Sequence, residues 1–182
     1  MSIARLRHEE ISAPLNSLND PFRTAMRHLA GAVSVISVGR GNDISGLTAT
    51  SVSSLSLEPP TILVSINRAA SSWPLLNRHG CFGVNVLSDS QADIAERFAG
   101  RDGLKHAERF QGADWEVLET GAPMLIDALA AFDCKVERII GHHSHSIVIG
   151  EVKSVRIQSH RRPLLYLRGA FGRFEELGPI DD

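Results

Sequence analysis

Short runs of β-branched and other apolar residues, bounded by glycine- or proline-containing turns, recur along most of this chain. Residues 32–38 and 61–67 show the pattern, and residues 81–87 are almost continuously apolar. Runs of this length and composition predict β-strands. The turn cluster at 39–43, with the run at 44–50 behind it, predicts a hairpin. Strands and helices do not alternate regularly, so a doubly wound nucleotide-binding fold is not expected.

The second half of the chain predicts two long strands and a final short one. Residues 145–158 and 163–167 read as strands, preceded by a strand around residue 132. In that strand alternate residues are charged, so one face is expected to be buried and Asp133 to lie on the wet face. Gly150 interrupts the second long strand and predicts a β-bulge or a close backbone approach.

Helix signals are few and short. Asp20 is a suitable N-cap for a first helix, and Ser71 or Ser72 could cap a second one. Residues 90–93 resemble a capping box that opens a third helix. Residues 100–121 are polar and glycine-rich, which predicts an excursion on the surface. Together with the strands, these signals predict a mainly β fold with peripheral helices, either a β-barrel or a sandwich.

Length and charge predict a single-domain protein and argue against binding to nucleic acid or to a membrane surface. The 182 residues fit one domain, expected at 20–174, between a lead-in at 1–19 and an acidic tail at 175–182. A net charge of −2 gives no basic field for nucleic acid or a membrane surface. The N-terminus lacks a signal-peptide core, so the expected compartment is the cytoplasm. The two cysteines, Cys81 and Cys134, are expected to be buried free thiols.

The stretch at residues 46–60 is crowded with small hydroxyl side chains, carries a single charge and ends in two prolines. One interpretation is a Ser/Thr-rich turn that hydrogen-bonds its own backbone. The other is a seat for a flat, neutral ligand with polar edges, such as an isoalloxazine ring. The residues of the stretch alone leave both interpretations open.

Several other polar residues have two interpretations each. His143 and His145 would share a strand face, but a third metal ligand is not evident, so no metal is expected and one ligand-contacting histidine is favoured. Ser71 and Ser72 could approach a phosphate or could simply cap a helix. Arg168 could neutralise a phosphate or a reduced flavin, or could be a solvated strand-end charge.

Six segments taken together, in their order and spacing, resemble one known family. They are residues 25–33, 46–60, 82–87, 94–99, 144–152 and 163–169. The chain resembles the short-chain flavin reductases, which are the reductase components of two-component flavin monooxygenases, over about residues 20–174.

This resemblance implies a homodimeric, Greek-key split β-barrel that binds FMN or FAD near the subunit interface. It implies that NADH or NADPH reduces the flavin, which then passes to a separate monooxygenase. The implied cofactor-binding residues are Thr48, Ala49, Thr50 and Ser51 at the ring edge, Ser65, Ile66 and Asn67 on the next strand, Ser71 and Ser72 near the phosphate, and Phe98 beside the flavin. His145 would contact the nicotinamide as a positioning group, because hydride transfer between the two cofactors needs no general base.

The chain departs from the family pattern at two places. Many members have Gly-Asp-His where this chain has His143, Ser144 and His145, so the carboxylate is missing. Many members also have histidine where Leu167 stands. Two other functions remain open on the sequence: an electron carrier that keeps its flavin, and a non-enzymatic split-barrel module. The sequence chooses neither between FMN and FAD nor between NADH and NADPH.

Overall fold

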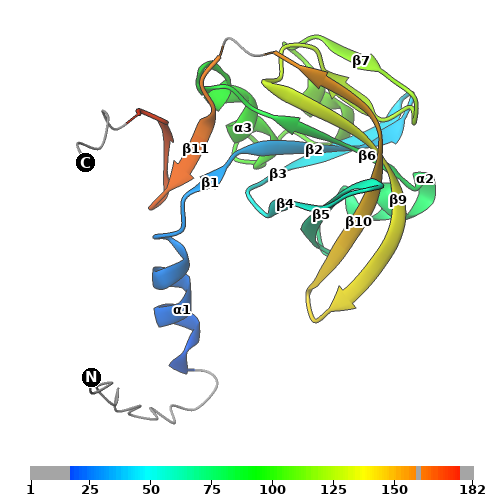
Figure 1. Cartoon of the computed structure of the whole chain (residues 1–182). Helices are drawn as coiled ribbons and strands as arrows, with labels where there is room; N and C mark the ends of the chain where they lie inside the picture. The colour runs from blue at the N-terminus through cyan, green and yellow to red at the C-terminus, as the bar shows by residue number, and fades with distance from the viewer. Residues whose placement is uncertain (1–16, 159–160, 177–182) are drawn as a thin grey trace, which may run out of the picture.

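The computed structural model describes residues 17–158 and 161–176, so most of the expected lead-in and tail lies outside the described residues. The fold is mainly β with peripheral helices, as predicted, and all strand pairs in the three sheets are antiparallel (Figure 1). The seven-stranded main sheet has the order β3-β2-β6-β9-β10-β5-β4. Its strands are β2 (Ser34–Arg40), β3 (Asp43–Ala49), β4 (Val52–Leu57), β5 (Pro60–Asn67), β6 (Cys81–Val86), β9 (Ala130–His142) and β10 (His145–Ile157).

The described residues also form two smaller sheets and three short α-helices. The smaller sheets are β1 (Gly31–Ala32) with β11 (Leu164–Leu167) and β12 (Ala170–Arg173), and β7 (Trp115–Val117) with β8 (Pro123–Leu125). The helices are α1 (Asn19–Met26), α2 (Trp73–His79) and α3 (Ala92–Phe98), with 3₁₀ turns η2 (Asp89–Gln91) and η3 (His106–Phe110).

The chain connection between β3 and β4 forces the main sheet to curl. These strands are its two edges, and at about 4.8 Å between neighbouring strands a flat sheet would hold them about 29 Å apart. Only Thr50 and Ser51 join them, and so short a link spans at most about 11 Å. The edges therefore approach each other at Thr50 and Ser51, although in the described part of the chain no ladder pairs β3 with β4. We call this junction the seam.

The core consists of two clusters on either side of β2 and β6. One contains Val33, Leu87 and the buried face of α3, and the other contains Ile36, Val64 and Phe82. An aromatic group within the first cluster joins α3 to the segment after it. Phe98 lies 5.0 Å from Phe110 and 5.6 Å from Trp115, measured between ring centroids. The surface excursion predicted for residues 100–121 is therefore wrong in part, because Phe110 is buried at 8% exposure.

Two predicted helix N-caps were wrong. The N-cap of α1 is Leu18 rather than Asp20. The N-cap of α3 is Gln91 rather than Ser90. A capping box does occur here, but it opens the 3₁₀ turn η2: the Gln91 side chain accepts a hydrogen bond from the Ser88 amide at 2.9 Å. Ser72 is the N-cap of α2, although its side chain makes no capping hydrogen bond.

The hydroxyl-rich stretch, for which two interpretations were open, is mostly strand: its first residues end β3, and Val52–Leu57 form β4, which pairs with β5. At its end the Ser56 hydroxyl still hydrogen-bonds the backbone of Glu58 at 3.2 Å.

Two predictions about polar residues were wrong. Asp133 is completely buried, because a loop covers this face of β9. From that loop the amide of Thr120 donates to the Asp133 carboxylate at 2.7 Å. His143 does not share a strand face with His145, since it lies in the β9–β10 turn with φ of 47°.

The prediction for Gly150 was confirmed on both counts. The pairing of β9 with β10 shifts register between Ile149 and Gly150. A Cβ at Gly150 would lie 2.5 Å from ring atoms of Phe82. The expected free thiols were confirmed as well, since Cys81 and Cys134 are both buried.

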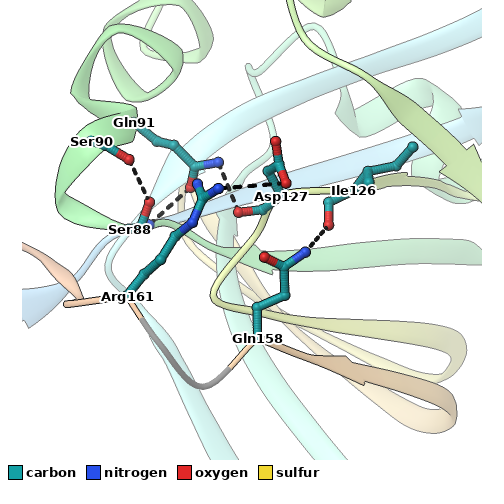
Figure 2. Close-up of polar contacts among 7 residues, drawn as sticks. All are labelled: Ser88, Ser90, Gln91, Ile126, Asp127, Gln158 and Arg161. Atoms are coloured by element: carbon teal, nitrogen blue, oxygen red, sulfur yellow. Dashed lines mark hydrogen bonds and ion pairs between the residues drawn. The ribbon is translucent and has the colours of Figure 1, made fainter.

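A polar network anchors the part of the chain that leads into β11 (Figure 2). Gln91 donates to the Asp127 carbonyl at 3.0 Å, and Gln158 donates to the Ile126 carbonyl at 2.8 Å. Arg161 lies 3.6 Å from the Asp127 carboxylate. The network thus ties the end of β10 and the start of the β11 region to the base of α3, which fixes where β11 lies relative to the main sheet.

Candidate functional site

A cavity of about 200 Å³ lies at the β3 side of the seam. Three residues predicted to hold the isoalloxazine edge line it together: Thr48, Ala49 and Thr50. Its other lining residues come from β1–β2, β11, β12 and the end of α3: Val33, Ala99, Arg101, Tyr166 and Phe171. The structure thus places residues from five segments of the chain around the predicted site.

The three seam residues differ in what they can offer a ligand. The Thr48 hydroxyl donates to the Ala95 carbonyl at 2.6 Å, so its proton is already committed to α3. The Ala49 side chain is buried at 8% exposure. Thr50 is exposed and also lines a second cavity, of about 310 Å³, which it shares with Tyr166 and the end of α1. Thr50 and Tyr166 therefore stand where the two cavities meet.

The predicted residues beyond the seam form one outward face of the main sheet. The Ser51 hydroxyl donates to the Ser65 carbonyl at 2.9 Å, which joins the seam to β5. Along β5, Asn67 lies opposite His145 of β10. Because neighbouring residues of a strand face opposite ways and Ile66 is buried at 1% exposure, Ser65, Asn67 and His145 share the outer face.

The imidazole of His145 contacts the side chain of Ser144, the residue that stands where many flavin reductases have aspartate. Its Nδ1 lies 2.9 Å from the Ser144 hydroxyl, and the Ser144 carbonyl accepts the Arg68 amide at 2.9 Å. The hydroxyl therefore contacts one ring nitrogen and leaves Nε2 of the exposed imidazole for a ligand. Ser144 can orient the ring, but without a carboxylate's charge.

The remaining predicted residues, Ser71, Ser72, Phe98 and Arg168, are not among the residues that line the cavity. Ser71 is exposed, whereas Ser72 is 1% exposed and its buried hydroxyl has no hydrogen-bond partner. Phe98 is 1% exposed and supports β3 from beneath, so close that a Cβ at Gly46 would lie 2.7 Å from its ring. Arg168 is exposed in the β11–β12 turn, beside α1.

Sequence reasoning missed the residues that complete the cavity. Tyr166 and Phe171 pack with ring centroids 5.5 Å apart and form its wall on the β11–β12 side. Tyr166 is the chain's only tyrosine, and its sequence context gives no signal beyond membership of the predicted strand at residues 163–167. Arg101 lies in the glycine-rich segment interpreted as surface, and only its contact with the cavity singles it out.

In residues 17–158 and 161–176, no three His, Cys, Asp or Glu side chains gather as metal ligands would. The helices within those ranges are all too short or too polar to span a bilayer.

Comparisons with known proteins agree with this arrangement. The family model described as "Flavin reductase like domain" matches residues 26–175. The chain is 43% identical over 148 residues to the FMN reductase (NADH) RutF 2 of Methylorubrum extorquens, covering 80% of this chain and 83% of that one. The chain therefore belongs to the flavin reductase-like family.

Solved structures give the same relationship. The NADH:FAD oxidoreductase SgcE6 of Streptomyces globisporus C-1027, in complex with NAD and FAD fragments, superimposes with a TM-score of 0.81 at 29% identity, covering 92% of this chain and 100% of that one. BorF, the flavin reductase component of a bacterial two-component tryptophan halogenase, superimposes with a TM-score of 0.79 at 32% identity, covering 87% and 99%.

Proposed function

We propose that this chain is an NADH-dependent flavin reductase that transfers hydride from reduced nicotinamide to FMN or FAD. The reduced flavin would then leave for a separate oxygenase component. The observation that carries the proposal is the cavity at the seam, which Thr50 and Tyr166 line. The Ser51 hydroxyl joins this seam to Ser65 of β5, the strand that pairs with the strand of His145. The names of the relatives support NADH as the donor and flavin as the acceptor.

The residues around the seam fit a flavin ring. The β3 side of the cavity presents backbone, small hydroxyls and methyl groups, which suit a neutral ring with polar edges. The aromatic side chains of Tyr166 and Phe171 supply a surface against which a flat ring can pack. When bound, the nicotinamide and flavin supply the hydride chemistry themselves.

The protein's own contribution would be to position the flavin and the nicotinamide relative to each other. Thr50 and Ser51 would hold the ring edge, with Ser65, Asn67 and the backbone of Ile66 alongside it. His145, oriented by Ser144, would place the nicotinamide. Thr48, Ala49 and Phe98 would shape the site from behind. Ser71, Ser72 and Arg168 remain proposed cofactor contacts, and the functional unit is proposed to span residues 20–174.

We also propose that the chain acts as a homodimeric split barrel. Helix α1 has no buried residue, its apolar side chains Phe22 and Met26 are 64% and 47% exposed, and Leu29, just after the helix, is 67% exposed. A helix this short is not stable in water without packing. Figure 1 shows α1 standing away from the main sheet. A second copy covering α1 would also enclose the cavity that α1 lines.

The test is oxidation of NADH and of NADPH by the purified chain with added FMN, FAD or riboflavin. The proposal predicts turnover that depends on added flavin and is faster with NADH. A protein that stays yellow through gel filtration and bleaches slowly with NADH would instead indicate an electron carrier. Absence of flavin binding would indicate a non-enzymatic module.

A further inference from the structure

Two arginines from distant parts of the chain meet at the end of α1. The Arg27 guanidinium donates to the Arg168 carbonyl at 3.0 Å, and the Arg168 amide donates to the Arg27 carbonyl at 2.9 Å. One Nη atom of Arg168 lies 3.3 Å from Nδ1 of His28. These three side chains, which we call the α1 cationic cluster, are all exposed.

The backbone is shaped to allow this meeting. Arg168 and Gly169 form a two-residue hairpin turn with φ of 53° and 90°. Positive φ at both positions is what such a turn requires, and it is unusual for arginine. A Cβ at residue 169 would lie 2.7 Å from the Arg27 guanidinium, so glycine leaves the space that Arg27 occupies.

The cluster lacks the negative charge that would normally accompany it. Among the ion pairs of the described residues, none includes Arg27 or Arg168. Arg23, one turn before Arg27, pairs only with the exposed Asp20 at 3.4 Å. Guanidinium groups gathered without carboxylates repel each other, and their planar donor forks match the oxygens of a phosphate.

One member of the cluster, Arg27, also borders the site. Arg23 and Arg27 line the cavity of about 310 Å³, whose wall includes Thr50 and Tyr166, the residues shared with the seam cavity. We propose that Arg27 and Arg168, assisted by His28, bind a phosphate group of a nucleotide whose ring lies at the seam. The phosphate is either that of the flavin or the pyrophosphate of the dinucleotide. This inference rests on the proposed function.

The test uses equilibrium binding, which needs no turnover. Arg27→Gln and Arg168→Gln remove a charge and keep most of the stem, while Arg168→Lys keeps the charge and loses the fork. Arg173→Gln is the matched control, because Arg173 lies in the same small sheet and pairs with Glu175 at 3.3 Å. The probes are FMN, riboflavin, which lacks the phosphate, and ADP-ribose, which lacks the nicotinamide.

Loss of a charge-assisted hydrogen bond predicts weakening of about tenfold to a hundredfold for the phosphate that the cluster binds. If it is the flavin phosphate, both Gln variants lose affinity for FMN but not for riboflavin. If it is the dinucleotide, they lose affinity for ADP-ribose alone. Arg168→Lys should recover part of the loss, and Arg173→Gln should match wild type. Affinities for all three probes within about twofold of wild type in both Gln variants would overturn the inference. Absence of NADH-dependent flavin reduction in wild type would instead refute the proposed function.

Discussion

Replacing His145 tests the role of the histidine that the structure places at the start of β10. Nε2 of its exposed ring would make one hydrogen bond to the nicotinamide carboxamide. A net hydrogen bond contributes about 0.5 to 1.5 kcal/mol, so His145→Ala should raise the KM for NADH about twofold to twelvefold. The dissociation constant of FMN should change less, since the flavin is assigned to the seam.

Ser144 provides an internal check on that magnitude. It contacts the imidazole at 2.9 Å and would act only through it. Ser144→Ala should therefore raise the KM for NADH by less than His145→Ala, and the double variant should be no worse than His145→Ala alone. His145→Gln, which keeps a polar group at a similar reach, should recover part of the loss.

The assay is initial-rate NADH oxidation at saturating FMN, with flavin affinity measured separately by fluorescence quenching. His142→Ala is the matched control, because His142 lies opposite His145 in the same hairpin and has no proposed role. The reasoning is refuted if His145→Ala leaves the KM for NADH unchanged, or if it weakens FMN more than NADH.

Three further predictions concern the scaffold around the site. Gly150→Ala should lower the free energy of unfolding by about 1 to 3 kcal/mol, because the new Cβ would lie 2.5 Å from the Phe82 ring. The measurement is denaturant unfolding. Gly172→Ala is its control, because a Cβ there would meet open space. Burial raises the pKa of the Cys134 thiol from 9.0 to about 12. The unfolded chain therefore loses this proton first, so the free energy of unfolding should fall by up to about 1.4 kcal/mol per pH unit above pH 9, and Cys134→Ala should flatten that decline in urea titrations. Thr48→Val should lower the free energy of unfolding by about 1 kcal/mol, because it removes the hydrogen bond to the Ala95 carbonyl of α3. It should weaken FMN binding less than Thr50→Val does. Equal effects of the two variants on FMN affinity would contradict the assignment of the Thr48 proton to α3.

The parts of the fold that the sequence predicted are those where local pattern and tertiary environment agree. β5 and β6 are buried runs of apolar residues, and their patterns predicted them correctly. Gly150 predicted both a bulge and a close approach, because one missing Cβ serves both.

The structure differs from the sequence-based predictions where a strand is irregular or where a segment distant in sequence covers it. β4 has a register shift between Ser54 and Ser56, and this bulge disrupts the alternation that would have marked a strand. Asp133 looked exposed because its strand alternates, but a loop that contains Thr120 covers that face. No local pattern indicates such a covering.

The residues of the candidate site also fall into two groups: those predicted from local motifs and those that only the tertiary fold brings to the cavity. The seam residues and His145 were predicted from motifs, because each motif is continuous in the sequence. Tyr166, Phe171 and Arg101 join the cavity only because β11, β12 and the segment after α3 fold against β3. The meeting of Arg27 with Arg168 is likewise a contact across 141 residues of sequence.

The most direct test of the account is anaerobic rapid mixing of the protein and FMN with NADH, followed by the flavin's visible absorbance. Thr50→Trp is the matching variant, since Thr50 lines both cavities and is exposed, so a large side chain would fill the site with little effect on the core. We predict rapid bleaching with wild type, and bleaching close to the protein-free rate with a Thr50→Trp variant that is folded by circular dichroism. Wild-type protein that bleaches flavin no faster than NADH alone, or a variant as fast as wild type, would contradict the account.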